Sequence, residues 1–339
     1  MMGAKTRHSG MELLRIIAMA LVVLAHLDFW ALGYPTHKLC ATDMQHAAYQ
    51  YFVEFFALVC VNCYIFISGW FSIKPRFKGF ANLLFQIFFY NLLIYLICAF
   101  TGYVPLSFKH FIHHLNVLTH WFIPSYIGLY LLSPILNLFI ENASKRQSLI
   151  TVVAFVLLDV LLGWVHDYLG FNGGYSLLHF MVIYMIARYI KMHGGRVFSL
   201  NKKWDMLVYC LISTLVPLIV VVSYYQAPSL WIVAGKLFWY NNPLIIISSV
   251  YFSLFFTKLN FQSKFVNTVG ASSFAVYLIH TDVLVRGWCI RDFSRYLFYS
   301  HNVIFFSVAT VLLIVALFTV ALVLDYIRLR LWLKIQSLM

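Results

Sequence analysis

Long apolar runs, separated by short polar segments, follow one another along almost the whole chain. A helix needs about 20 apolar residues to cross a bilayer. With that length as the guide, the pattern predicts ten membrane-spanning helices, at 11–32, 52–71, 80–102, 121–140, 148–165, 174–192, 204–223, 242–257, 266–285 and 302–325. The segment 228–242, PSLWIVAGKLFWYNN, is apolar but short, which is typical of an interfacial or re-entrant piece.

Composition supports a membrane location. Hydrophobic residues make up 63% of the 339 positions and charged residues only 10%, a balance that a soluble protein cannot divide between core and surface. The loops between the predicted helices are short, and the sequence contains no internal repeat or low-complexity tract. We therefore expect an all-α integral membrane protein, with one transmembrane domain over residues 1–339 and no appended soluble domain.

The net charge of +13 raises the question of nucleic-acid binding, which the placement of the basic residues answers. With both termini on the cytoplasmic side, sixteen of the 24 Lys and Arg residues fall in cytoplasmic segments, six in outer segments and two within spans. This bias follows the positive-inside rule. It predicts cytoplasmic N and C termini in a cell inner (plasma) membrane, with membrane lipids and no nucleic acid as partners.

The first predicted helix contains RIIAMALVVLAH, an apolar run that begins with Arg15 and ends with His26. Ionisable side chains within a bilayer are costly and usually face the bundle interior or a water-filled path. Eleven residues turn a helix by three full turns and about 20°, and advance it by about 16.5 Å. Arg15 and His26 are therefore expected on one helix face, at two depths of the membrane.

Two more polar residues are expected near the depth of His26. At 1.5 Å per residue, His26 lies about 22 Å and His280 of VYLIH about 21 Å from the cytoplasmic edge of their spans. Glu54, close to the outward end of the second span, lies near the same level. Glu54 could orient a histidine, but we expect it to lie at the membrane interface. His280 has two interpretations, one structural and one catalytic.

Small and basic residues gather at the inner level. Arg15 lies about 6 Å from the cytoplasmic edge, and Ser68 and Gly69 end the second predicted span at this depth. Three cations follow directly: Lys74, Arg76 and Lys78. A layer of this kind suits an anion, although positive-inside anchoring explains these three cations as well.

The remaining polar residues carry weaker signals. Asp159 and His179 are buried by position and are expected to form hydrogen bonds between helices. Cys40 and Cys289 both fall on the outer side, where a disulfide between them is open. One outer loop contains the histidines His110, His113, His114 and His120. Without cysteines or nearby carboxylates they are weak evidence for zinc, so we expect no metal; headgroup contact or an acceptor cleft with Trp121 and Tyr126 fits better.

Four motifs occur in the order found in membrane acyltransferase family 3. The pair of Arg15 and His26 matches the family's Arg-x10-His signature, and VNCYIFISGWF resembles its FFxxSGxx motif. HWFIPSYIGLYLLSPILN resembles its fourth-helix element and SSFAVYLIHTDVLV its YLxH helix. The resemblance runs from about residue 11 to 325 and is nearest to polysaccharide and enterobacterial-common-antigen O-acetyltransferases.

The resemblance implies an O-acyltransferase that uses cytoplasmic acyl-coenzyme A, usually acetyl-coenzyme A, as the donor. The acceptor is then a hydroxyl of a cell-surface polysaccharide, a lipopolysaccharide or a lipid-linked saccharide precursor. A sugar hydroxyl needs a base near neutral pH, and histidine has a suitable pKa. We therefore expect His26 to be the general base, with acylation of His26 itself as the alternative route, and His280 to act beside it.

Donor binding is assigned to the inner layer. The forked, delocalised charge of Arg15 suits a phosphate or the thioester carbonyl. Ser68 and Gly69, followed by Lys74, Arg76 and Lys78, would extend that site toward the phosphates of coenzyme A. The alternative function is a proton-coupled transporter or exporter, since intramembrane histidines also form proton relays. Transporters more often contain internal repeats or broken helices, and the sequence indicates neither.

Overall fold

Helices make up 83% of the part of the protein that the structure describes. The computed structural model describes residues 7–115, 121–168 and 170–337, and within them it contains no strand, which confirms the all-α prediction. The first half comprises α1 (Ser9–Ala25), α2 (His37–Thr42), α3 (Met44–Ala57), α4 (Val59–Phe71), α5 (Phe77–Phe100), α6 (Phe108–His114), α7 (Phe122–Asn142) and α8 (Lys145–Leu158). The second half comprises α9 (Leu177–His193), α10 (Lys202–Gln226), α11 (Pro228–Val233), α12 (Pro243–Thr257), α13 (Lys264–Ala271), α14 (Ser273–His280), α15 (Phe293–Ser300) and α16 (Val303–Ser337).

Each of the ten predicted spans corresponds to helix, but not each is a continuous crossing. By length and composition, seven described helices could cross a membrane, or eight if a bent pair counts as one span. The predicted span 174–192 is α9, which has only 17 residues. The predicted span 266–285 consists of the two short helices α13 and α14. The count of ten spans is therefore not confirmed, because apolar periodicity does not reveal where a helix breaks.

Broken helices surround the middle of the protein, contrary to the sequence-based expectation. The helix that begins with α1 continues as a π-helical segment, His26–Trp30, in which Asp28 has non-helical torsion angles (φ −98°, ψ −105°). The buried Asp28 carboxylate accepts a hydrogen bond from Gln50 at 3.0 Å. The segment Pro228–Phe238 meets α12 at an angle of 44°, which agrees with the re-entrant interpretation of residues 228–242.

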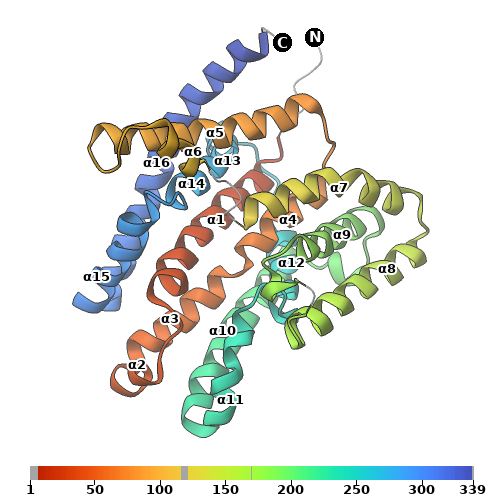
Figure 1. Ribbon diagram of the computed structural model, residues 1–339. Helices are drawn as coiled ribbons and strands as arrows, with labels where there is room; N and C mark the ends of the chain where they lie inside the picture. Colours follow the sequence, from red (N-terminus) through yellow and green to blue (C-terminus); the bar gives the residue numbers. More distant parts are fainter. Residues whose placement is uncertain (1–6, 116–120, 169, 338–339) are drawn as a thin grey trace.

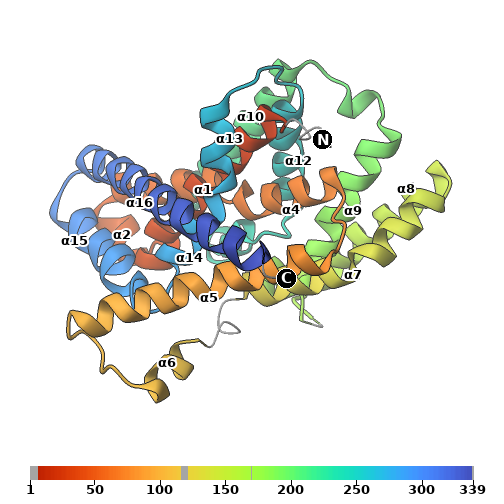
Figure 2. The same cartoon turned by 90° about the horizontal axis from the view of Figure 1, so that it is seen from above.

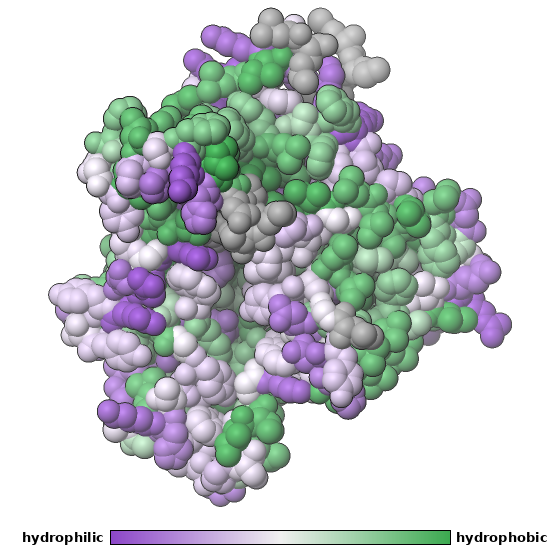
Figure 3. Space-filling model, in the orientation of Figure 1, coloured by the Kyte–Doolittle hydropathy of each residue, from purple (hydrophilic) through white to green (hydrophobic). Residues whose placement is uncertain are grey.

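The central helices are α1 and α4. Helix α1 packs against α3, α4, α12, α13, α14 and α16, and α4 packs also against α9 and α12. Seen from above, α5 and α8 lie at the periphery (Figure 2). Hydrophobic side chains cover the outer surface of α5, α7 and α8 (Figure 3), which is the surface expected to face lipid.

The start of α1 and the end of α16 lie toward the same end of the helix bundle, and α2, α11 and α15 lie toward the opposite end (Figure 1). This arrangement agrees with N and C termini on one side of a membrane. That this side is cytoplasmic stays a prediction from the distribution of Lys and Arg.

Candidate functional site

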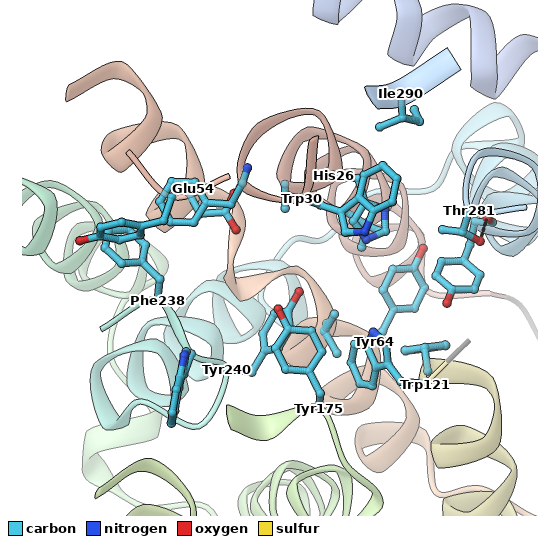
Figure 4. A pocket seen from close by; sticks show the side chains of 18 of the residues that line it. His26, Trp30, Glu54, Tyr64, Trp121, Tyr175, Phe238, Tyr240, Thr281 and Ile290 are labelled. Carbon is cyan, nitrogen blue, oxygen red and sulfur yellow. Dashed lines mark hydrogen bonds between the residues drawn. The ribbon is translucent and has the colours of Figure 1, made fainter. Parts of the chain in front are cut away.

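A cavity of about 830 Å³ lies among the central helices. Its walls come from α1, α3, α4, the start of α7, α14 and the bent segment 228–242. In Figure 4, His26 and Trp30 lie across the cavity from Tyr175 and Tyr240, with Glu54 and Thr281 on opposite sides. Most of the other large lining side chains are aromatic, so the cavity combines apolar walls with a few polar groups, as ligand sites do.

His26 and His280 meet in this cavity. His26 Nδ1 lies 3.0 Å from His280 Nε2, and His280 Nδ1 lies 2.6 Å from the carbonyl oxygen of Val276. The prediction that the two histidines share one level is therefore confirmed. A carbonyl oxygen only accepts, so His280 carries its proton on Nδ1, and its Nε2 accepts from His26 Nδ1. In neutral His26 this tautomer places the basic lone pair on Nε2, the arrangement of an oriented general base.

Glu54 lies inside the protein, so its expected interfacial position is wrong. Its side chain lines the same cavity as His26 and is buried, and its Oε2 accepts a hydrogen bond from the backbone N–H of Phe29 at 3.3 Å. Phe29 lies in the π-helical segment His26–Trp30, directly after Asp28 with its non-helical torsion angles. The tertiary contact, which the sequence does not reveal, satisfies the donor.

Arg15 is held by an acidic neighbour that the sequence analysis missed. Its Nη1 lies 2.5 Å from Glu12 Oε2, and 28% of the Arg15 side chain is exposed. Arg15 does not line the described cavity, but its carbonyl oxygen accepts a hydrogen bond from Tyr64, which does. The i, i+3 spacing of Glu12 and Arg15 was a readable signal for this pair. Glu12 thus already partly neutralises the positive charge of Arg15, which the sequence analysis assigned to anion binding.

Gly69 lies at the contact between α4 and α9, and the neighbouring Ser68 lies beside Tyr126 of α7. A Cβ atom added to Gly69 would lie 2.6 Å from the carbonyl oxygen of Tyr184, so this position requires glycine for close helix packing. Ser68 Oγ donates to the carbonyl oxygen of Tyr64 and lies 3.4 Å from the Tyr126 hydroxyl. Packing alone therefore accounts for Gly69, and a role of either residue in donor binding stays a prediction.

The basic segment, defined as Lys74, Arg76 and Lys78, joins α4 to α5. Its three side chains are exposed and lie outside the described cavity. Its backbone, by contrast, is fastened: Tyr184 and Asn137 bond the N–H and carbonyl of Ile73, and the Tyr130 hydroxyl bonds Arg76. The connection therefore presents its cations from a fixed position.

Asp159 and His179 form the predicted inter-helix hydrogen bond. His179 Nδ1 lies 2.7 Å from Asp159 Oδ2, and His179 Nε2 lies 2.8 Å from Asn62 Oδ1. Asn62 also donates to the carbonyl oxygen of Tyr240 in the cavity wall. The three side chains are fully buried and connect α4, α9 and the π-helical segment Asp159–Val165.

The outer-loop histidines do not gather around a metal site in the described residues. His114 Nε2 lies 3.2 Å from Asp282 Oδ2 in a buried contact, and His110 bonds Ser107 at the start of α6. His120 lies outside the described residues. Trp121 lines the cavity, as expected for an acceptor cleft, whereas Tyr126 does not. Cys40 and Cys289 are free thiols, so the disulfide left open by the sequence is not formed.

Several cavity residues were not singled out from the sequence. Tyr175 and Tyr240 form one wall, and Lys236 and Arg286 supply its basic side chains. Tyr34 also lines the cavity, and burial raises the pKa of its hydroxyl to about 12, so it stays protonated at neutral pH. The ambiguous segment 228–242 was the available signal, because an apolar piece too short to span a bilayer lies within the protein or along its interface.

Comparison with known proteins identifies the family. No curated protein and no solved structure matches the chain. The sequence profile of an acyltransferase domain, that of acyltransferase family 3, matches residues 8–326, which is nearly the whole chain. Together with the long apolar helices, this match makes the protein a multi-pass membrane enzyme that transfers acyl groups. The chain belongs to acyltransferase family 3.

Proposed function

We propose that the protein is an O-acyltransferase of the inner (plasma) membrane that moves an acyl group, most simply acetyl, from cytoplasmic acyl-coenzyme A to a glycan hydroxyl. The acceptor is a surface polysaccharide, a lipopolysaccharide or a lipid-linked saccharide precursor. The observation that carries the proposal is the hydrogen-bonded pair of His26 and His280 in an aromatic cavity of a chain that belongs to an acyltransferase family.

The histidine pair supports a direct transfer. His26 Nε2 accepts the proton of the acceptor hydroxyl while the oxygen attacks the thioester carbonyl carbon. The carbon–sulfur bond then breaks, and the imidazolium of His26 returns its proton to the sulfur of coenzyme A. His280 Nδ1–H donates to the carbonyl oxygen of Val276, and His280 Nε2 accepts the Nδ1–H of His26, so His280 orients the His26 ring and stabilises the positive charge that develops there. Acylation of His26 remains the alternative route.

The donor route follows the helices that carry this pair. Helices α1, α4 and α14 all contribute to the cavity, and the inner ends of α1 and α4 carry Arg15 and lead into the basic segment. We infer that the coenzyme A phosphates bind near the basic segment and that the pantetheine arm reaches the cavity past Tyr64. Tyr64 supports this route because it lines the cavity and bonds the backbone of Arg15.

One feature of the structure is also found in transporters, which are the alternative function. Broken helices near a central site are a feature of many transporters, and the described helices are broken at His26–Trp30, between α13 and α14, and between residues 238 and 243. The family match favours acyl transfer. The helix breaks are compatible with this function as well, because they place the histidines and the bent segment around one cavity.

Mass spectrometry of the host's surface glycan, with the chain expressed and with it deleted, tests the proposal. We expect an acyl substituent on the glycan only when the chain is present, and its mass identifies the acyl group. Vesicles that contain the purified chain, labelled acetyl-coenzyme A and glycan provide the direct assay. An unmodified glycan whose abundance at the surface falls on deletion would indicate export and contradict the proposal.

A further inference from the structure

Two basic side chains line the cavity without a carboxylate partner among the described residues. Arg286 and Lys236 both contribute to its wall, from the segment after α14 and from the bent segment before α12. Neither lies within ion-pair distance of any described Asp or Glu, including Glu54 in the same cavity. Arg286 contacts an aromatic ring instead, and Lys236 contacts a backbone carbonyl and an aromatic ring.

The contacts of these two cations position their side chains but do not neutralise their positive charges. Arg286 Cζ lies 5.6 Å from the centre of the Trp30 ring, a cation–π contact, and Trp30 follows His26 by one helical turn. Lys236 Nζ donates to the carbonyl oxygen of Val165 at 2.8 Å and lies 5.3 Å from the Trp239 ring. A carbonyl and a π face carry only partial charges, so neither contact neutralises the cation.

Arg286 is half-buried and Lys236 is exposed, and the other half-buried or buried basic residues differ from Arg286 in their partners. Every one of four such residues contacts an Asp or Glu: Arg15 with Glu12, Arg188 with Glu141, Lys258 with Asp205 and Arg328 with Asp325. The positive-inside bias also leaves only six Lys and Arg residues on the predicted outer side, and two of these six line the cavity. A half-buried Arg286 without a carboxylate partner among the described residues, together with an exposed Lys236 in the same cavity wall, indicates a ligand that supplies the negative charge.

We propose that Arg286 and Lys236 bind an anionic group, a phosphate or a carboxylate, of the acceptor saccharide at the outer mouth of the cavity. This inference rests on the proposed function and specifies its acceptor class. Guanidinium and ammonium groups form charge-assisted hydrogen bonds with such anions. The aromatic walls, including Trp30 and Trp239, pack against the apolar faces of the sugar rings.

The position of Arg286 assigns this anion to the acceptor. Trp30 contacts both the His26 ring, at 6.1 Å between centroids, and Arg286, so the cation lies close to the proposed base. In acyl-coenzyme A the phosphates are separated from the thioester by the whole pantetheine arm. When the thioester lies at His26, those phosphates therefore cannot also lie at Arg286, whereas a charged group on the acceptor sugar or on its lipid linkage can.

Binding of simple anions to the purified full chain tests the site without any acyl transfer. Inorganic pyrophosphate and glucuronate serve as probes, glucose as the neutral comparison, and tryptophan fluorescence as the signal. We expect at least one anion to bind in preference to glucose, and the double variant Arg286→Gln, Lys236→Gln to bind it about tenfold more weakly. The charge-preserving double variant Arg286→Lys, Lys236→Arg keeps most of the binding and shows that the fold is intact.

The matched control removes the same charge elsewhere on the predicted outer side. Lys109→Gln with Arg291→Gln changes two exposed cations outside the cavity, and we expect wild-type anion binding. If neither anion binds, or if the control weakens binding as much as the cavity variant, the inference is wrong.

Acyl transfer in vesicles identifies the source of the anion. The glycan is offered intact, after mild acid that removes a lipid diphosphate, and after chemical reduction of its carboxylates to alcohols. Loss of acylation with the first treatment assigns a phosphate, and loss with the second assigns a sugar carboxylate. Full acylation after both treatments contradicts the inference while the proposed function stands. Anion binding at the two cations with no acylation of any glycan contradicts the proposed function instead.

Discussion

Arg15 of α1 and His26, which directly follows α1, are eleven residues apart and so share one helix face, yet they differ in what surrounds them. At the inner end, Arg15 pairs with Glu12 and lies outside the cavity. At the outer end, His26 lines the cavity and is oriented by His280. A shared helix face therefore determines the direction in which the two side chains point, but not which groups surround them. The histidine is arranged for proton transfer, whereas the arginine must share its charge with a carboxylate before it can serve a ligand.

The largest difference between the two ends is expected in catalysis. Substitution of a general base removes about 10²- to 10⁴-fold of rate, so His26→Ala should lower acyl transfer in vesicles at least about 100-fold and leave the protein in the membrane. His37→Ala, at an exposed histidine beyond the same helix, is the control and should keep wild-type activity. If well-expressed His26→Ala transferred acyl groups at the wild-type rate, His26 would not be the general base and the contrast with Arg15 would be wrong.

His280 tests whether orientation of the base matters as much as the base itself. A lost hydrogen bond of this kind costs about 1 to 3 kcal/mol, so His280→Ala should slow transfer about 10- to 100-fold with donor binding kept. His280→Gln offers an amide oxygen that can accept from His26 Nδ1, and it should restore part of the rate. Equal loss in both variants would mean that His280 does more than accept this hydrogen bond.

A substitution at Gly69 tests whether the inner end of α4 serves helix packing or ligand binding. Gly69→Ala forces a Cβ against the carbonyl of Tyr184, and overpacking of this kind costs about 1 to 3 kcal/mol of the free energy of unfolding. We expect a lower thermal midpoint in detergent, with donor affinity unchanged in the protein that remains folded. Ser68→Ala is the neighbouring control and should change stability little. A selective loss of donor binding in Gly69→Ala would show direct contact with the donor.

Arg15→Lys separates charge from shape at the same end. Lysine can keep the ion pair with Glu12 but lacks the fork that suits a phosphate or thioester carbonyl. We expect a folded protein with acyl transfer lowered about tenfold, as for the loss of one charge-assisted hydrogen bond. Full activity of Arg15→Lys in vesicles would mean that the pair with Glu12 is the whole role of Arg15.

The smallest effect is expected from the basic segment. Exposed charges contribute about 1 kcal/mol or less each, so replacing all three residues by glutamine should weaken acyl-coenzyme A binding severalfold and flatten its dependence on salt. Binding is measured on detergent-purified protein. The control replaces three exposed cations elsewhere on the predicted cytoplasmic side, Arg196, Lys202 and Lys203. Unchanged affinity and salt dependence would mean that the basic segment only anchors topology.

Depth along a helix predicted one long-range contact well. His26 and His280 are 254 residues apart, and equal depth in two spans indicated that they could meet. The buried pair of Asp159 and His179 followed from the same argument, because a polar side chain within a bilayer needs a partner. Glu54 shows the limit of this method: its depth was estimated, but neither its burial nor its hydrogen bond to Phe29, at the helix break His26–Trp30, was indicated by a local pattern.

The sequence by itself determined the fold class, the membrane location and the family. These follow from local features, since a long apolar run in a bilayer must satisfy its backbone internally and therefore forms helix. The tertiary structure alone decided that segment 228–242 lines the cavity, that Glu54 is buried there and that Arg286 and Lys236 lack carboxylate partners among the described residues. Such contacts depend on how helices pack, and packing between apolar helices arises from many weak contacts that leave no periodic signal in the chain.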